Sequence, residues 1–522
     1  MLDFKNCYLG IELGSTRIKS CLIDSFGKPI ESGIYEWDNK CENGFWTYDL
    51  NQAIYGIGQC YLDLKKKVRL ATGQFISTLG GIGISAMMHG LIALDENNRL
   101  LTPFRTWRNN YTEDSAKELS EAFGFNIPAR WSISHLYYSI ENHEEFAERI
   151  DRITTLSGYI NEKLTGVCGL GKGDASGMFP VDEKGQYNSE YIKIINKMIA
   201  KKGLHINVEE MLPKILNCDE YIGKLTPEGA LILDPDGNLL PGIPFVAPEG
   251  DVATGFMATN SIKPRDGNIS AGTSIFGSFV LDKPLKKAYP EIDVVVTPDG
   301  KSVAMVHCNN CSSGINECVG LVNDTLRTFG VWKDEKDIFE TLFKSALDYQ
   351  GDFKHIAFYN YLSGENITKV NKGAMLLAHS SGNSINLGEV VLGELFSSFS
   401  TFNVGMRILK NEGIKLDNIF VHGGVFKTKG VAQKVFSSVI EEPLSLNKEA
   451  SEGGSWGMAL LCLYPKYHEK YAINEFLEKV VFKNQEFIKE IPDPHLVKQY
   501  HQFELLFIKC LKGQRILGKE LA

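Results

Sequence analysis

A short turn near the start of the chain carries residues that could bind a phosphate. It lies between two apolar runs within residues 8–24, a pattern that predicts a strand, a turn and a second strand. Glycine lets backbone amides approach a ligand, hydroxyls donate hydrogen bonds, lysine adds positive charge, and a carboxylate can orient hydrated magnesium. These residues are Glu12, Gly14, Ser15, Thr16 and Lys19. An ordinary hairpin explains the same pattern, so this turn alone leaves both interpretations open.

A second turn of this kind lies half a chain away, within residues 268–282. Gly272, Thr273 and Ser274 again separate two strand-like runs. Two lobes that each present such a turn could hold the phosphates of a nucleotide from both sides, with the chemistry between them. Neither turn has the Walker pattern Gly-x-x-x-x-Gly-Lys-Ser/Thr or the dinucleotide pattern Gly-x-Gly-x-x-Gly.

The composition predicts a globular protein with two large domains. The chain has 522 residues, too many for one core, and 43% of them are hydrophobic. The formal net charge is −9 and basic residues are scattered, so no nucleic-acid partner is predicted. The sequence has no basic-then-apolar leader and no apolar run of membrane-spanning length, which predicts a cytoplasmic protein without a membrane partner. The oligomeric state stays open, with a homodimer as one candidate.

The cysteines predict a reducing compartment. There are eleven, mostly inside apolar runs, and we expect no disulfides. One group contains a Cys-x-x-Cys pair and leaves a zinc or redox site as an alternative: His307, Cys308, Cys311 and Cys318. A structural zinc site usually has a second ligand pair at motif spacing, and none follows here. Ordinary core thiols are therefore the preferred interpretation.

Strand-like and helix-like segments alternate in both halves of the chain, which indicates layered α/β domains. Residues 113–202 are largely helical and charged, and we expect them to shape a substrate pocket. Gly423 and Gly424 follow a strand and permit the close approach of a flat or charged ligand. Helices are predicted at 50–67 and 387–410, strands at 76–85, 245–247 and 418–421, and an amphipathic helical tail beyond about residue 485.

In the order of its segments, the chain resembles the FGGY family of carbohydrate kinases over nearly its whole length up to the tail. Residues 86–95 resemble the Gln-Met-His-Gly-Leu-type substrate segment of the family, and residues 250–255, Gly-Asp-Val-Ala-Thr-Gly, resemble its catalytic loop. No single match decides the resemblance, but their order does. The other matching segments are 11–19, 156–166, 173–177, 272–274, 361–365, 423–439 and 452–461.

The resemblance implies a particular architecture. This is an α/β fold of two lobes, the duplicated ribonuclease-H-like fold of the actin and hexokinase type, with the active-site cleft between the lobes. Residues 1–256 would form an N-terminal lobe with the sugar site and the first phosphate motif. Residues 257–485 would form the nucleotide-binding C-terminal lobe, and residues 486–522 a helical tail.

The resemblance also implies ATP and Mg²⁺ as cofactors, with Asp251 as the general base that takes the proton of a sugar hydroxyl. An aspartate that caps the following helix explains Asp251 equally well, and both roles can hold together. Glu12 would position the magnesium, although the family usually has aspartate there. The phosphates would be held by Gly14, Ser15, Thr16 and Lys19 from one lobe and by Gly272, Thr273 and Ser274 from the other, with the adenosine against Gly423 and Gly424.

By the same resemblance, the sugar would contact Met88, His89, Trp107, Asp174 and Asp251. A structural role is the alternative for the histidine, and an exposed loop position is the alternative for Asp174. Trp107 lies in Thr-Trp-Arg-Asn-Asn, where relatives commonly carry Trp-x-Asp-x-Arg. Glu249 replaces the small residue that usually precedes Gly-Asp. These two departures leave the identity of the sugar open.

Together these expectations describe an ATP-dependent kinase that phosphorylates a hydroxyl of a sugar, with a ketopentose such as xylulose or ribulose preferred. Two alternatives remain at this point. One is a nucleotide-dependent switch that uses the same clamp without phosphorylating a sugar. The other is a sugar sensor that binds its ligand and has lost turnover.

Overall fold

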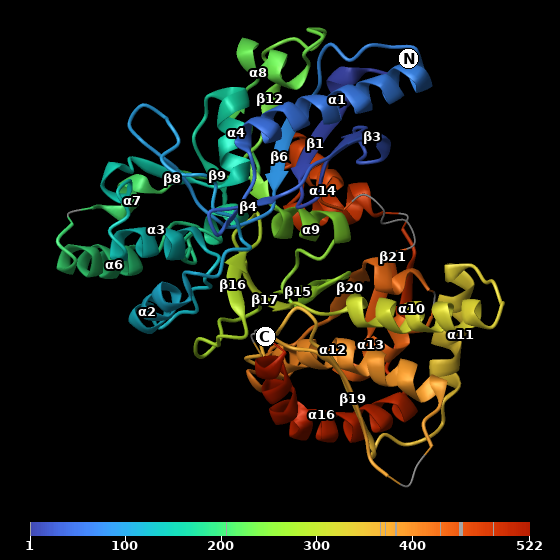
Figure 1. The fold of residues 1–522 in the computed structure, drawn as a ribbon. Helices are drawn as coiled ribbons and strands as arrows, with labels where there is room; N and C mark the ends of the chain where they lie inside the picture. Colours follow the sequence, from blue (N-terminus) through green and yellow to red (C-terminus); the bar gives the residue numbers. More distant parts are fainter. Residues whose placement is uncertain are drawn as a thin grey trace.

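The computed structural model describes residues 2–204, 206–365, 367–370, 372–381, 384–428, 430–447, 453–483 and 485–521. They form two lobes, each built around a seven-stranded sheet, and Figure 1 shows the two lobes one above the other. The lobe around the sheet nearer the N-terminus is called the first lobe, and the other the second lobe.

The first sheet starts with three antiparallel strands, β1 (Tyr8–Leu13), β2 (Arg17–Ile23) and β3 (Pro29–Glu36). β6 (Gly81–Ala86) pairs with β1 in parallel. Short strands extend the sheet beyond β6, namely β11 (Gly223–Lys224), β12 (Pro244–Phe245) and β13 (Glu249–Gly250). Because β1, β6 and β13 run in parallel and end in register, the residues that follow them lie at one edge of the sheet.

The second sheet repeats this arrangement. β14 (Asp266–Ala271) pairs with β15 (Ile275–Val280) in antiparallel, and β17 (Ser302–Cys308) and β16 (Asp293–Val296) continue the antiparallel set. β20 (Asn418–His422) is parallel to β14, as β6 is to β1. β21 (Leu444–Asn447) and β22 (Phe487–Glu490) complete the sheet. The predicted duplicated α/β fold of two lobes is confirmed.

Helices cover both faces of the first sheet. α1 (Leu50–Thr72) and α4 (Leu156–Thr165) pack on one face, with α8 (Pro227–Leu233) against these two helices. α9 (Asp251–Thr259) and α14 (Gly453–Leu463) pack on the other face. α14 comes from far along the chain and lies close to β1 because Gly10 has no side chain. A Cβ there would lie 2.1 Å from the carbonyl oxygen of Ser455.

The second lobe has its core around α12 (Leu387–Asn411), which is buried along most of its length. The helices around it are α10 (Ser312–Thr328), α11 (Glu335–Asp348), α13 (Ala432–Ile440) and α16 (Pro494–Glu520). Phenylalanine side chains such as Phe396, Phe399 and Phe402 pack between these helices and the sheet.

A mainly helical insertion lies beside the first lobe, as predicted for residues 113–202. Its helices are α2 (Glu113–Phe123), α3 (Ser132–Glu141), α5 (Lys172–Ser176), α6 (Ser189–Lys201) and α7 (Val208–Met211). Further elements include the short helix α15 (Ile473–Phe476). Four two-stranded pairings lie outside the main sheets: β4 (Lys40–Glu42) with β5 (Phe45–Thr47), β7 (Ile92–Leu94) with β8 (Arg152–Thr154), β9 (Leu170–Gly171) with β10 (Ile215–Leu216), and β18 (Ile356–Asn360) with β19 (Met375–His379).

Most of the predicted elements are present. α1 begins at Leu50, after the Asp49 side chain accepts a hydrogen bond from the Asn51 N–H, and ends before Gly73 in the left-handed conformation. The tail is the exception, because it starts with β22 and only then becomes helical as α16. Within the described segments, no helix combines the length and the apolar character that crossing a membrane requires.

Candidate active site

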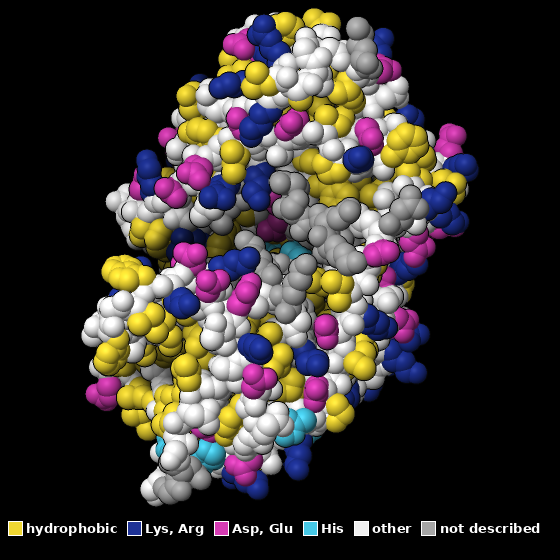
Figure 2. All heavy atoms as spheres, turned by 90° about the vertical axis from the view of Figure 1, so that its right-hand side faces the viewer, with side chains coloured by type: hydrophobic (Ala, Val, Ile, Leu, Met, Phe, Trp, Pro, Cys, Tyr) yellow, Lys and Arg dark blue, Asp and Glu magenta, His cyan; other side chains and the backbone are white. Residues whose placement is uncertain are grey.

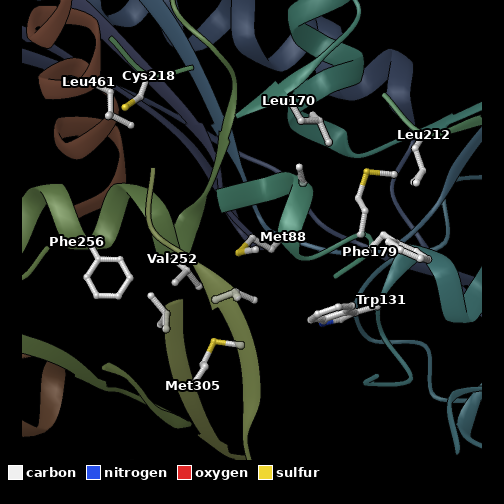
Figure 3. Packing of buried hydrophobic residues seen from close by; sticks show 14 of the residues in the cluster. Met88, Trp131, Leu170, Phe179, Leu212, Cys218, Val252, Phe256, Met305 and Leu461 are labelled. Atoms are coloured by element: carbon white, nitrogen blue, oxygen red, sulfur yellow. The ribbon is translucent and has the colours of Figure 1, made fainter. Parts of the chain in front are cut away.

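A cavity of about 250 Å³ lies between the two lobes. Figure 2 shows the molecule hollowed there, with acidic and histidine side chains at the bottom of the hollow. Both lobes contribute to its lining, including apolar side chains labelled in Figure 3: Met88 after β6, Val252 on α9 and Met305 on β17. The lining residues are Ser15, Met87, Met88, His89, Trp107, Arg130, Asp251, Val252, Ser274, Phe276, Met305 and His307.

The first predicted phosphate turn reaches this cavity through Ser15. The Gly14 N–H donates to the Arg17 carbonyl at 2.9 Å, which closes the turn between β1 and β2. Two buried aromatic residues hold it from outside: Trp37 Nε1 donates to the Gly14 carbonyl at 2.7 Å, and the Tyr48 hydroxyl donates to the Ser15 carbonyl at 2.8 Å. Thr16 and Lys19 are not among the cavity-lining residues, and their phosphate contacts stay predictions.

The second predicted turn reaches the same cavity through Ser274. The Gly272 N–H donates to the Ser274 carbonyl at 2.9 Å. The turn is tied to the start of α10, since the Cys311 N–H donates to the Thr273 carbonyl at 2.9 Å and the Ser312 N–H to the Gly272 carbonyl at 3.0 Å. Gly272 and Thr273 do not line the cavity, although Thr273 is exposed to solvent.

Asp251 is the first residue of α9 and lines the cavity directly after β13. Its side chain is accessible from the cavity, yet protein surrounds the site, and this burial raises the pKa of Asp251 to about 6. Its Oδ1 accepts the Val252 N–H at 3.0 Å, so the carboxylate also satisfies the helix N-terminus. The two interpretations that the local sequence left open are therefore compatible.

Glu12 lies at the junction between β1 and the start of α14. Its carboxylate accepts the backbone N–H of Ser455, and the space it fills is the one that a side chain on Gly454 would need, since a Cβ there would lie 1.9 Å from Glu12 Oε1. Burial and the nearby charge of Asp251 raise the pKa of Glu12 to about 7, while Lys19, its partner across the strands, acts in the opposite direction. Glu12 is not among the cavity-lining residues, and its contact with magnesium stays a prediction.

His89 is held in one tautomer. Its backbone has the positive φ of 72°, and its Nδ1 lies 3.1 Å from the Gly177 carbonyl. A carbonyl can only accept, so Nδ1 carries the proton and Nε2 is left as an acceptor. Burial, and next the charge of Arg130, lower the pKa of His89 well below its usual value, so the ring is neutral.

Trp107 is half-buried at the cavity wall. Asn109 stands where the expected Trp-x-Asp-x-Arg motif has aspartate. It is buried and hydrogen-bonded to the backbone of β5, which explains an amide at this position. Its side-chain amide donates to the Trp46 carbonyl at 2.8 Å, and its Oδ1 accepts the Trp46 N–H at 2.8 Å. Tyr111 stands at the place of the arginine in the expected Trp-x-Asp-x-Arg motif, and its hydroxyl lies 2.9 Å from His135 Nδ1.

Asp174 is 1% exposed and is not among the cavity-lining residues. Its Oδ2 accepts the Thr155 hydroxyl at 2.6 Å, and burial raises its pKa to about 6. The alternative of an exposed loop carboxylate is therefore wrong, and the proposed sugar contact of Asp174 stays a prediction. The structure places this carboxylate against the hydroxyls of Thr155 and Ser157.

Glu249 is buried next to Asp174. Its Oε2 accepts the Asp174 N–H at 2.9 Å, and burial followed by the Asp174 charge raises the pKa of Glu249 to about 8. The large side chain fits because Gly171 and Gly173 leave room, since a Cβ on either glycine would lie 2.1 or 2.7 Å from the Glu249 carboxylate. Glu249, in place of the small residue expected before Gly-Asp, is thus accommodated by these two glycines.

Gly423 and Gly424 lie at the end of β20, outside the cavity and exposed. Gly423 has a φ of 114°, and a Cβ there would lie 2.2 Å from the Ala271 carbonyl oxygen. Gly424 faces open space. Their proposed contact with the adenosine stays a prediction.

Sequence reasoning missed several cavity residues that come from distant elements. Arg130 precedes α3, and Phe276, Met305 and His307 lie on β15 and β17. Burial and then Arg130 lower the pKa of His307 to about 4, so it is neutral. Among the described residues, no three histidine, cysteine, aspartate or glutamate side chains lie close enough together to hold one metal ion. The alternative of a zinc site at His307 and the cysteines therefore finds no support.

The comparison with known families decides the class of protein. Residues 7–258 match the N-terminal domain, and residues 267–465 the C-terminal domain, of the FGGY family of carbohydrate kinases. The chain belongs to this family. It is therefore an ATP-dependent kinase of carbohydrates. The resemblance to the FGGY family and the kinase activity that the sequence predicted are both confirmed.

FGGY relatives with different named substrates are similar to this chain. A xylulose kinase of Haemophilus influenzae is 23% identical over 506 residues, covering 94% of this chain and 97% of that protein. A gluconokinase of Bacillus licheniformis is 23% identical over 373 residues, covering 68% of each. The crystal structure of ligand bound xylulose kinase from Lactobacillus acidophilus has a TM-score of 0.79 at 16% identity and covers 98% of this chain and 99% of that one. The fold of these kinases is shared.

Proposed function

We propose that this kinase transfers the γ-phosphoryl group of ATP to a terminal hydroxyl of a ketopentose of the xylulose or ribulose type. One observation carries the proposal: Asp251, His89 and a serine from each phosphate turn line a single small cavity. About 250 Å³ lies below the range of about 300–1,000 Å³ that is typical for drug-sized ligands, which suits a small sugar.

Asp251 would take the proton of the attacking hydroxyl. A sugar hydroxyl is a weak nucleophile at neutral pH, so a carboxylate must accept its proton as the phosphoryl group is transferred. With its pKa raised to about 6, Asp251 is mostly ionised at pH 7 and still close to the working pH, which favours proton transfer.

The two turns would hold the phosphates from opposite lobes, with Ser15 and Ser274 nearest the cavity. Glu12 would hold Mg²⁺ at the cleft, where the ion would neutralise phosphate charge. Closure of the lobes would then exclude water and limit ATP hydrolysis.

The sugar would lie against an apolar wall with one acceptor. Met88, Val252 and Met305 supply the apolar surface, and Trp107 can pack on the carbon face of the sugar. Neutral His89 presents Nε2 as an acceptor for a sugar hydroxyl.

The proposal is tested by ADP release with a panel of ketopentoses, aldopentoses, aldonates and polyols. We expect the highest kcat/KM with xylulose or ribulose. ATP consumption that depends on gluconate or glycerol, with none on ketopentoses, would overturn the substrate assignment.

A further inference from the structure

A second cavity, of about 400 Å³, adjoins the proposed sugar cavity. Trp107, Arg130 and His307 line both cavities, whereas Asp251 lines only the smaller one. A sugar whose reacting hydroxyl is at Asp251 and whose chain is too long for the smaller cavity must therefore pass these three residues. The second cavity could accept such a chain, because its lining includes the side-chain amides of Asn110, Asn126 and Asn309.

The backbone of Arg130 is hydrogen-bonded to the segment that carries Met88 and His89. The Gly90 N–H donates to the Arg130 carbonyl at 3.0 Å, and the Ser132 hydroxyl donates to the Gly90 carbonyl. Trp131, the residue between Arg130 and Ser132 in the chain, is fully buried. Its ring stacks on the His89 ring, with 6.2 Å between the ring centroids and an angle of 16° between the ring planes. A shift of the Arg130 backbone would therefore disturb the segment that carries His89.

The side chain of Arg130 reaches across to the other lobe. Its guanidinium forms an ion pair with Asp293 on β16, and the two side chains are 23% and 11% exposed. The Asn126 amide also donates to Asp293 at 2.9 Å and to the Ile292 carbonyl at 3.0 Å. Asp293 lies directly opposite Met305, a cavity residue, in the β16–β17 register. The pair therefore spans the two lobes at the boundary between the cavities.

The charges do not favour an acidic sugar in the second cavity. Its lining includes Arg108 and Arg130, but also Glu113, Glu291 and Asp293, and Arg130 is already paired with one of them. A free carboxylate would meet more negative than positive groups there. The lining suits a neutral polyhydroxy chain.

We propose that the Arg130–Asp293 pair closes the sugar cavity at its far end and thereby limits the chain length of the sugar. Arg130 is then a specificity-determining residue that selects a short ketose and excludes longer ones from the second cavity. This inference rests on the proposed function, because it takes Asp251 as the reacting end. Since the two residues come from different lobes, the barrier is complete only when the lobes are together.

The test compares kcat/KM for a series of ketoses with four to seven carbons in the wild type and in three variants. Arg130→Ala removes the barrier, and Asp293→Asn keeps its shape but releases the guanidinium. Arg130→Lys keeps the positive charge and most of the side-chain length, so it should keep the wild-type preference. Arg152→Ala is the matched control, since Arg152 forms a similarly buried ion pair with Glu162, at 19% and 18% exposure, away from both cavities.

For Arg130→Ala and Asp293→Asn, we expect kcat/KM for hexuloses and heptuloses to rise about tenfold or more relative to that for pentuloses, the scale of discrimination that one carbon unit allows. Arg130→Lys and Arg152→Ala should keep the wild-type ratio. The inference is overturned if Arg130→Ala or Asp293→Asn turns over pentuloses with an unchanged chain-length ratio. A wild type that accepts no ketose would instead overturn the proposed substrate, and this outcome is distinguishable from the first.

Discussion

Ser15 and Ser274 line the same cavity, although they belong to turns of two different sheets. Each lies in the turn between the first two strands of its sheet, β1 and β2 in one lobe and β14 and β15 in the other. The duplicated fold brings these turns to one cavity, and Asp251, which directly follows β13, lines that cavity with them. A kinase needs this convergence of phosphate donors and a base.

The activity should depend on pH through Asp251. Burial raises its pKa to about 6, and only the ionised form can accept a proton. We therefore expect kcat/KM for the preferred sugar to fall as the pH drops through about 6, measured from pH 5 to 9. A kcat/KM that stays nearly constant down to pH 5, as the ordinary aspartate pKa of about 4 would give, would contradict this.

Gly454→Ala should weaken the response to magnesium without unfolding the protein. The added Cβ would lie 1.9 Å from Glu12 Oε1 and force that carboxylate to move. We expect the Mg²⁺ concentration for half-maximal activity to rise about tenfold. Gly513→Ala is the control, because Gly513 lies on α16 with open space around it. Equal Mg²⁺ dependence in both variants would remove Glu12 from its proposed role.

The two glycines after β20 should respond differently to alanine. Gly423→Ala would place a Cβ 2.2 Å from the Ala271 carbonyl and strain a backbone with φ 114°, at a cost of about 1–3 kcal/mol or more. Gly424→Ala meets open space, so its thermal unfolding should match the wild type while KM for ATP rises. An unchanged KM for ATP in Gly424→Ala would argue against an adenosine site there.

Glu249 should make stability depend on pH. Its pKa is about 8 in the folded protein and near 4.5 when unfolded, so the folded state keeps a proton that the unfolded state has released. The free energy of unfolding should therefore decrease as pH rises from about 4.5 to about 8, by up to about 1.4 kcal/mol per pH unit. Glu249→Gln should lose this slope between pH 7 and 8. Glu148→Gln is the control, because Glu148 is exposed, and its free energy of unfolding should show the same pH dependence as that of the wild type. Denaturant titrations measure these free energies. An equal pH dependence in the wild type, Glu249→Gln and Glu148→Gln would show that Glu249 does not cause it.

Local patterns in the sequence predicted the elements that carry the chemistry, because each is encoded within a few residues. The turn at Gly14, the turn at Gly272 and the helix that starts at Asp251 are examples. Contacts between distant segments could not be predicted in this way. The backbone of Arg130 is hydrogen-bonded to Gly90, 40 positions earlier in the chain, and the residues next to Arg130 in the sequence do not indicate this contact.

The packing of α14 on the first sheet could not be predicted from local patterns either. It requires a glycine at position 10, more than 400 positions earlier in the chain. The strand β22 was missed for a similar reason. Its residues form a strand because they pair with β21, whereas their sequence pattern continues into an amphipathic helix.

Asp251→Asn tests the central claim most directly. Asparagine keeps the shape of the side chain and an oxygen that can accept the Val252 N–H, so the fold should persist, but it cannot take a proton. With the preferred sugar, we expect sugar-dependent ADP formation to fall by about 10²–10⁴, while ATP binding measured by calorimetry stays at the wild-type level. Turnover near that of the wild type in a folded Asp251→Asn variant would contradict the account.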